Sequence, residues 1–158
     1  DIIVSGKGLG GGLPIGAFIS SKKIMDSLSD KPRLGHITTF GGNPVVAASA
    51  YETLKVITSS NLMQEALKKE SIIRNLLRHR LITEIRGKGL MLAMIVKSEE
   101  VADKLVIKAK ENGLLLFWLL IEKKGVRITP PLTISEKEIS FGCELIIQLL
   151  DDINRDVN

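Results

Sequence analysis

Cysteine and histidine are scarce in this chain of 158 residues, which has one cysteine, Cys143, and two histidines, His36 and His79. A single cysteine cannot form a disulfide within the chain, so a disulfide-stabilised secreted domain is excluded and a reducing cytoplasm is the expected compartment. The histidines and Cys143 do not have the spacing of metal ligands, and we expect no metal site. Cys143 lies in an apolar helical run and is expected to be a small core residue.

Long apolar runs are also missing, and aromatic residues make up only 4% of the chain. No run approaches the roughly 20 apolar residues of a membrane-spanning helix, and we expect no membrane association and no secretory leader. The net charge is +4, but both signs are mixed along the chain, so no basic arm or aromatic-interleaved stripe indicates nucleic acid. The clusters Lys68-Lys69 and Arg78-His79-Arg80 are expected on solvated helix faces.

An initiator methionine is missing as well. The chain begins "DIIVSGK", which reads as a buried strand running directly into a glycine-rich stretch. Because a domain rarely begins inside a buried strand, we expect the chain to be a fragment whose N-terminal part is not included. With 44% hydrophobic and 25% charged residues it nevertheless has enough apolar material for a real core.

Capping residues and hydrophobic periodicity predict the elements. Asn43 followed by Pro44 is typical of a helix start, and Ser135 with Glu138 predicts a capping box. After residue 81 the pattern indicates a compact α+β unit of the order β-β-α-β-β-α. The expected strands are 2–4, 15–20, a pair within 81–96 around Gly87-Lys88-Gly89, a buried strand at 114–120, and 125–131; the expected helices lie near 21–28, from 43 onward, at 62–77, 98–112 and 136–153.

The stretch "GKGLGG" at residues 6–11 formally fits the G-x-G-x-x-G pattern of dinucleotide-binding proteins. That pattern must open a helix, whereas Pro14 and a β-type segment follow here. A P-loop has its lysine after the glycines and beside Ser or Thr, but Lys7 precedes most of them. Both nucleotide-binding hypotheses are therefore disfavoured.

Imine formation with a carbonyl cofactor is a third possible chemistry, and it suits a lysine that is followed by several glycines. A lysine that forms an imine with a carbonyl cofactor must be desolvated to become nucleophilic. A position at the end of a buried strand would desolvate Lys7, and the glycines that follow would leave room for a flat ring against the backbone. The alternative is an exposed lysine beside a flexible turn.

The segment "SGKGLGGGLPIGAF" resembles the cofactor-lysine segment of the class III, ornithine-aminotransferase-like enzymes that use pyridoxal 5'-phosphate. "HITTFGGNP" at 36–44 resembles the second signature of that family. "IRGKGLMLAM" at 85–94 and "VRITPPLTIS" at 126–135 resemble its C-terminal landmarks. The four segments occur in family order across nearly the whole chain.

The resemblance implies roles for individual residues. Lys7 would hold pyridoxal phosphate through a Schiff base and, once freed, would transfer the substrate proton as general base and acid. Thr39, with Thr38 beside it, would bind the cofactor phosphate from the neighbouring subunit of a homodimer; alone, this loop could equally be a helix cap without a ligand. Arg127 would contact the substrate carboxylate or a gating glutamate, although an arginine on such a strand is more often an ordinary surface residue. Arg86 is expected to be structural.

The implied fold is α/β, part of a fold type I pyridoxal-phosphate transferase. Residues 1–58 would be the tail of a large domain with a mostly parallel sheet, and residues 59–158 a small C-terminal α+β domain, bridged by helices within 43–79. The phosphate-binding cup, the aromatic residue that stacks on the ring and the aspartate that pairs with the ring nitrogen would lie upstream, so the chain alone is expected to be inactive or nearly so.

The implied activity is transfer of an amino group from an amine or amino acid to a 2-oxo acid. A decarboxylase or an aminomutase of the same fold is an alternative, because both retain the lysine and the glycines. A non-catalytic dimerisation module is another. Trp118, in the bulky segment "LLLFWLLIEKKGVR", is expected in the core, with the substrate entrance as its alternative position.

Overall fold

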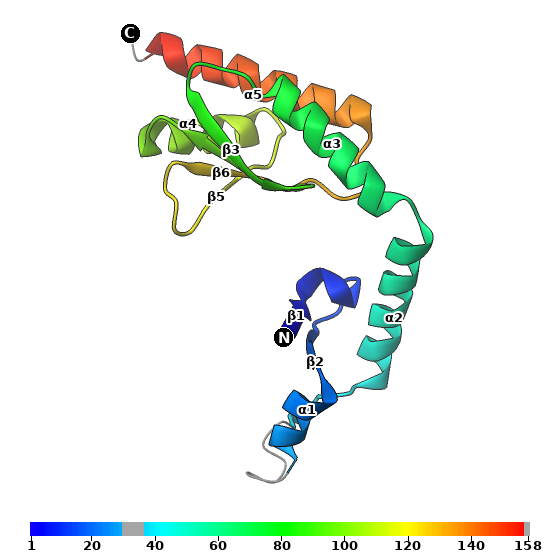
Figure 1. Ribbon diagram of the computed structural model, residues 1–158. Coiled ribbons are helices and arrows are strands. Elements are labelled where there is room, and N and C mark those ends of the chain that lie inside the picture. The colour runs from blue at the N-terminus through cyan, green and yellow to red at the C-terminus, as the bar shows by residue number, and fades with distance from the viewer. Residues whose placement is uncertain (30–36, 157–158) are drawn as a thin grey trace. The chain divides into compact units, whose positions relative to one another are not determined.

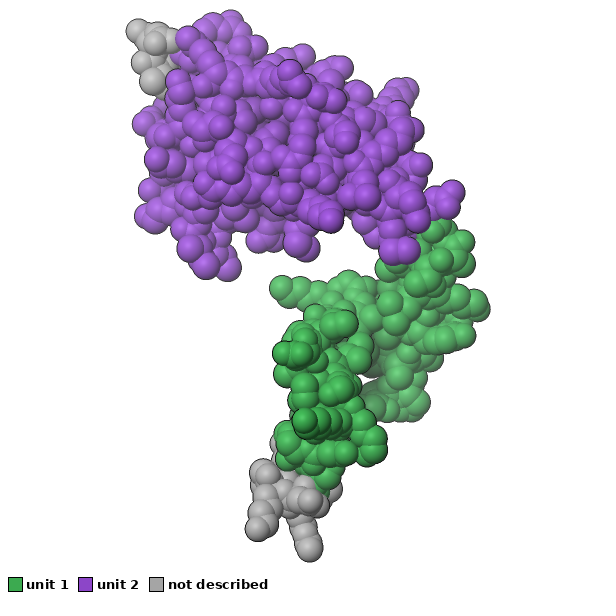
Figure 2. Space-filling view, in the orientation of Figure 1, with its two compact units in different colours: residues 1–60 green, residues 61–158 purple. Residues whose placement is uncertain are grey.

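The computed structural model describes residues 1–29 and 37–156. The chain divides into two compact units, Asp1–Ser60 and Asn61–Asn158, which are coloured separately in Figure 2. Each unit has its own sheet and its own helices (Figure 1).

The first unit is built on a pair of antiparallel strands, β1 (Ile2–Gly6) and β2 (Gly16–Ser20). The 3-10 helix η1 (Lys7–Gly10) begins the connection between them. A short helix α1 (Lys22–Met25) continues as a 3-10 turn, η2 (Asp26–Leu28), and confirms the helix expected near residues 21–28. The mostly parallel sheet expected for this part is not formed by the described residues, whose strands pair only antiparallel.

Helix α2 (Pro44–Ser59) begins where the sequence predicts, because the Asn43 side chain accepts hydrogen bonds from the backbone N–H groups of Val45 and Val46. The helix packs on η1, and the Ser49 hydroxyl donates to the Gly10 carbonyl over 2.7 Å. Gly10 and Ala50 are the only buried residues among the described positions of this unit. The first unit therefore has almost no core of its own.

The second unit contains a four-stranded antiparallel sheet in the order β3-β4-β6-β5. Its strands are β3 (Ile82–Lys88), β4 (Met91–Val96), β5 (Phe117–Trp118) and β6 (Gly125–Ile128), and its helices are α3 (Leu62–Leu76), α4 (Glu99–Glu111) and α5 (Glu136–Asp156). The predicted order β-β-α-β-β-α is confirmed. The predicted capping box of Ser135 and Glu138 is confirmed, and the Ser98 hydroxyl caps α4 by accepting a hydrogen bond from the Val101 N–H.

The three helices pack against one face of this sheet, and their buried side chains form a single core. Met94 and Val126 of the strands are fully buried beneath Leu105 of α4 and Leu150 of α5. Cys143 belongs to this core, as predicted. Ala93 and Arg127, the strand neighbours of Met94 and Val126, point to the opposite, open face of the sheet, because successive side chains of a strand point to opposite sides.

The predicted buried strand at 114–120 is wrong. Only Phe117 and Trp118 pair with β6, and the side chains of Leu120 and Ile121 are each 96% exposed. The chain leaves β6 after two residues because a turn follows, in which Gly125 N–H donates to the Glu122 carbonyl. A continuous apolar run cannot by itself distinguish a buried strand from an apolar surface segment. Trp118 is 41% exposed, and its indole N–H donates to Asp103 rather than packing in the core.

The expectation of solvated basic clusters is also wrong in part. Lys69 is only 6% exposed, and its ammonium donates to the Leu132 carbonyl over 2.8 Å. His79 follows the end of α3, and its Nε2 lies 3.2 Å from the carboxylate of Asp151 on α5. Both residues connect α3 and the segment after it to the C-terminal part of the unit.

Candidate functional site

Lys7 has an unusual backbone conformation. Its φ is +48°, and it is the only described residue other than glycine with a positive φ. A side chain in this left-handed region costs about 1 kcal/mol or more, and such strain concentrates at functional sites where the surrounding structure enforces it. The conformation places the lysine at the sharp change of direction between β1 and η1.

The glycines after Lys7 fall into two groups. Gly10 and Gly11 serve packing: the Gly10 carbonyl accepts the Ser49 hydrogen bond, and a Cβ at Gly11 would collide with the hydroxyl of Thr53. By contrast, a Cβ at Gly8, Gly12 or Gly16 would meet no atom within 4 Å. The first group holds the loop on α2, and the second leaves the backbone near Lys7 bare.

The described residues do not provide the expected desolvation of Lys7, since Lys7 and the strand before it are exposed. Ile3 and Val4 are 65% and 79% exposed, although they point to opposite faces of the strand. A strand that is apolar on both faces is typical of a sheet covered on both sides. The described residues of the first unit do not supply those covering layers.

Thr38 and Thr39 lie in the turn before α2. The Gly41 N–H donates to the Thr38 carbonyl, and the Asn43 N–H donates to the Phe40 carbonyl. Thr38 lines a hollow of about 540 Å³ together with residues from Pro14 to Gly16, whereas Thr39 is exposed outside it. Lys7 does not line this hollow. His36, the first residue of the corresponding sequence segment, lies outside the described residues.

The start of α2 is not an open anion site, because Asn43 already accepts hydrogen bonds from the N–H groups of Val45 and Val46. Donors for a phosphate in this loop must therefore come from the threonine hydroxyls and the turn before Asn43.

Arg127 lies on β6, in the second unit, on the open face of the sheet. Its neighbours Val126 and Ile128 are buried toward the helices, whereas Arg127 is exposed. Its guanidinium forms no hydrogen bond or ion pair with any other described residue. Arg127 also lines a cavity of about 350 Å³ beside β6.

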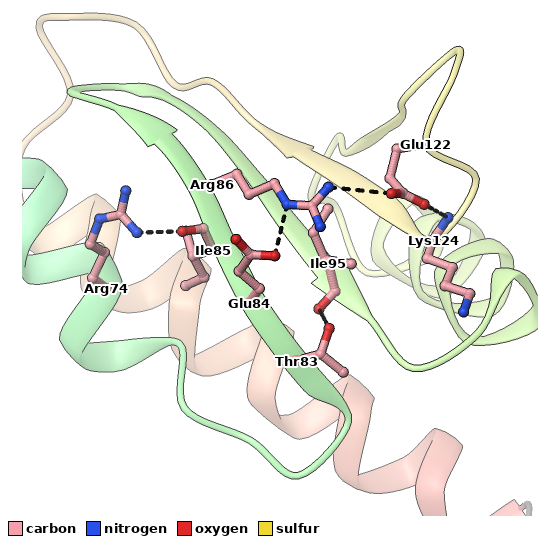
Figure 3. A network of polar contacts seen from close by, with 8 residues as sticks. All are labelled: Arg74, Thr83, Glu84, Ile85, Arg86, Ile95, Glu122 and Lys124. Atoms are coloured by element: carbon pink, nitrogen blue, oxygen red, sulfur yellow. Dashed lines mark hydrogen bonds and ion pairs between the residues drawn. The ribbon is translucent and has the colours of Figure 1, made fainter.

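A second arginine on the same face, Arg86, is fully engaged. Figure 3 shows its guanidinium extending to Glu84 on β3 and to Glu122 in the turn between β5 and β6, at 2.7 and 3.3 Å. The hydrogen bond that Arg86 donates to the Glu84 carboxylate is the main reason that the pKa of Arg86 is raised, with Glu122 adding to it. Arg86 connects the turn after β5 to β3, in agreement with the structural role expected for it.

The hairpin between β3 and β4 is held by two residues that the sequence interpretation missed. Arg74 on α3 donates to the carbonyls of Ile85 (Figure 3) and Gly87, and Glu70 accepts from the Gly89 N–H. Gly87 has φ +111°, and a Cβ there would collide with the Met91 carbonyl. The spacing of Glu70 and Arg74 indicates a helical ion pair, but nothing local indicates their backbone targets.

The residues of the first unit fit pyridoxal phosphate in their chemistry. Lys7 supplies an amine beside backbone that carries no Cβ, so a flat ring can approach it. Thr38 and Thr39 supply hydroxyl donors for a phosphate. No cluster of three or more acidic, histidine or cysteine side chains that could bind a metal occurs within residues 1–29 and 37–156. None of the helices described is long and apolar enough to cross a membrane.

Solved structures define the class of protein. The chain matches the ornithine aminotransferase of Toxoplasma gondii with a TM-score of 0.87 and 33% identity, over 99% of this chain and 38% of that one. It matches the acetylornithine aminotransferase of Elizabethkingia anophelis with a TM-score of 0.84 and 33% identity, over 96% of this chain and 41% of that one. The chain thus forms part of the α/β structure of a fold type I aminotransferase.

The family follows from the sequence comparisons. Residues 1–150 match the class-III aminotransferase family, and the chain belongs to it. Among curated relatives, it is 37% identical to the acetylornithine aminotransferase of Caldanaerobacter subterraneus subsp. tengcongensis, over 97% of this chain. It is also 37% identical to the leucine/methionine racemase of Thermococcus litoralis, again over 97%. The chain spans only 37% and 36% of the lengths of these two relatives. The sequence resemblance to this family is confirmed.

Proposed function

We propose that this chain is the C-terminal part of a pyridoxal-phosphate-dependent aminotransferase that moves an amino group from an amine or amino acid to a 2-oxo acid. The observation that carries the proposal is Lys7, held at φ +48° beside bare glycine backbone in a chain of the class-III family. When bound, pyridoxal phosphate supplies the electron sink that stabilises negative charge on the substrate carbon.

In this proposal Lys7 has two roles. Its ε-amine holds the cofactor covalently between turnovers, and the same nitrogen takes the proton from the substrate carbon and returns it during transfer. The strained backbone fixes the direction in which the side chain leaves the turn. Covering layers on both faces of β1, supplied by the rest of the protein, desolvate the amine so that it is a competent base.

Thr39 and Thr38 donate hydrogen bonds to the cofactor phosphate of the neighbouring subunit in a homodimer. Thr39 is exposed and does not line the hollow that Thr38 lines. Its hydroxyl is therefore accessible to a phosphate bound by another subunit. Arg127 holds the substrate carboxylate, since its guanidinium has no hydrogen-bond or ion-pair partner among the residues that the structure describes. We assign residues 1–58 to the large cofactor-binding domain and 59–158 to the small domain, and place the enzyme in the cytoplasm.

Racemisation is the second candidate activity, because one relative of equal identity is a leucine/methionine racemase. Racemisation also requires a base that removes the proton from the substrate carbon, which is the role proposed for Lys7, and in addition a proton delivered to the opposite face of that carbon. The fate of the amino group distinguishes the two reactions experimentally, since transfer requires a 2-oxo acid and racemisation does not.

The complete protein, loaded with pyridoxal phosphate, tests the proposal when it is incubated with single amino donors and 2-oxoglutarate. We expect glutamate to form, and Lys7→Ala to abolish its formation. Loss of optical activity of the donor without glutamate would establish a racemase instead. Release of carbon dioxide or an isomerised amine would establish a decarboxylase or an aminomutase. Absence of all these products in the loaded protein would favour a dimerisation module without catalytic activity.

A further inference from the structure

Lys69 is the one charged side chain that is buried among the residues that the structure describes. It lies on α3, and its ammonium donates a hydrogen bond to the backbone carbonyl of Leu132 over 2.8 Å. No carboxylate in the described parts of the chain forms an ion pair with it. Moving an ammonium out of water is costly unless it is paired or hydrogen-bonded. The contact with Leu132 is therefore the feature of Lys69 that needs an explanation.

Leu132 lies in the segment that joins β6 to α5, which we call the β6–α5 loop (residues 129–135). Two consecutive residues of this loop are prolines, which have no backbone N–H and cannot donate hydrogen bonds to neighbouring elements. Among the described residues, Lys69 makes the only hydrogen bond that reaches residues 130–134 from another element. The position of the loop therefore depends on Lys69.

The β6–α5 loop also forms part of the wall beside Arg127. Thr129, Pro130 and Pro131 line the cavity of about 350 Å³ that Arg127 lines as well. The guanidinium of Arg127 forms no hydrogen bond or ion pair with any other described residue, so within the described structure only packing against its neighbours restricts its side chain. A shift of the loop therefore changes the space in which Arg127 can lie.

We propose that Lys69 is a positioning residue for substrate binding. Its hydrogen bond to Leu132 keeps the β6–α5 loop in place, and the loop keeps the side chain of Arg127 where it contacts the substrate. Lys69 itself touches no substrate. This role rests on the proposed function, whereas the fixing of the loop by Lys69 does not.

Lys68 provides a matched control. Its ammonium forms an ion pair over 2.6 Å with Glu136, the first residue of α5, and both side chains are exposed. Lys68→Met and Lys69→Met thus remove adjacent ammonium groups from one helix, the first at the surface and the second inside. Methionine is a good helix former, and an apolar residue in place of a buried charge is often neutral for stability. We expect both variants to fold, with urea midpoints close to that of the wild type.

Hydrogen–deuterium exchange of the complete, cofactor-loaded protein measures whether Lys69 fixes the loop. The reporters are the backbone N–H groups of the loop, among them that of Ile134, which donates to the Pro131 carbonyl over 3.0 Å. In Lys69→Met the peptide that covers the loop should exchange at least about fivefold faster than in the wild type, because a loop with fewer hydrogen bonds opens more often. Lys68→Met should leave this exchange unchanged.

Steady-state kinetics of the same proteins measure whether the loop positions the substrate. Lys69→Met should raise KM for an amino acid donor and for 2-oxoglutarate by about tenfold while kcat stays within about twofold of the wild type, as expected when binding is lost without a change in the chemical step. A general loss of stability would instead lower kcat through the fraction of folded protein. Lys69→Arg retains N–H donors for the carbonyl and should keep both KM values within about threefold of the wild type.

Loop exchange in Lys69→Met equal to that in Lys68→Met would overturn the proposal. Unchanged KM values in Lys69→Met would also overturn it, as would an equal rise of KM in Lys69→Arg, because the hydrogen bond would then not be the cause. Failure of the proposed function has a different signature, namely no amino transfer by the wild type while Lys69→Met still accelerates exchange in the loop.

Discussion

At the scale of single residues, Lys7 is distinguished by its backbone rather than by its surroundings. The chain accepts a left-handed lysine where glycine would avoid the strain, although Gly6 precedes it directly and several glycines follow it. A residue kept at such a position despite the strain is retained for its side chain. The exposed β1 strand shows that the environment which activates this side chain is not formed by the described residues of the first unit.

The strain at Lys7 can be measured by comparing two substitutions in the complete protein. Lys7→Gly and Lys7→Ala should both abolish amino transfer, because neither supplies an amine. Lys7→Gly should nevertheless be the more stable by about 1 kcal/mol, since alanine keeps the left-handed strain and glycine removes it. Urea unfolding of both variants gives the difference. Equal stability, or a more stable Lys7→Ala, would show that the turn is not strained.

Glu70 makes stability depend on pH. Hydrogen bonds from Arg74 and the Gly89 N–H lower the pKa of its carboxyl below the usual value of 4.5. A lowered pKa in the folded state stabilises the protein above about pH 4.5, and this contribution is lost as pH falls through the folded value. The wild type should therefore lose stability between pH 7 and pH 3.5 more steeply than Glu70→Gln. Urea midpoints at several pH values test this, and parallel curves would contradict it.

At the scale of elements, the β3–β4 hairpin depends on two glycines with different constraints. A Cβ at Gly87 would collide with the backbone of β4, whereas at Gly89 it would meet only the Ala66 methyl at 3.8 Å. Gly89→Ala should cost about 1 kcal/mol from its positive φ alone. Gly87→Ala should cost at least about 2 kcal/mol, since the backbone must also shift. Chemical denaturation of the two variants compares them directly, and equal losses would argue against the collision.

Helix boundaries were the most predictable part of the fold, because capping is local chemistry. Asn43, Ser98 and the Ser135–Glu138 box act through residues two or three positions away. The segment 114–120 was mispredicted because its burial depends on how many of its residues pair with β6. Only two residues pair, and no local sequence pattern encodes that number. Lys69 was mispredicted for a similar reason, since its acceptor at Leu132 is distant in sequence.

The residues of the candidate site could be predicted from the sequence, whereas their geometry could not. The order of Lys7 and its glycines, and the position of Arg127, can be read from motifs. The positive φ of Lys7, the cavity beside Arg127 and the lack of a partner for Arg127 among the described residues can be seen only in the three-dimensional structure. Their roles in catalysis stay predictions.

At the scale of the whole molecule, the two units differ in what stabilises them. The second unit contains a contiguous core that includes Ile73, Leu105 and Ile153. The described part of the first unit buries only Gly10 and Ala50 and exposes large apolar side chains on β1, β2 and α2. Such a surface is typical of a segment that other parts of a protein or a second subunit cover.

Residues 61–158 should accordingly fold without residues 1–60. We expect dispersed amide signals and a cooperative urea transition with a slope of at least about 1 kcal/mol/M. Residues 1–60 alone should show neither. A second unit that unfolds without cooperativity, or a first unit that folds by itself, would contradict this division of stability.

The central claim is that Lys7 is the residue that binds the cofactor. The most direct measurement is reduction of the complete protein with sodium borohydride in the presence of pyridoxal phosphate, followed by peptide mapping. The account predicts the pyridoxyl group on the peptide that contains Lys7, and its loss in Lys7→Ala. Attachment at any other lysine, or no attachment in a correctly folded protein, would contradict it.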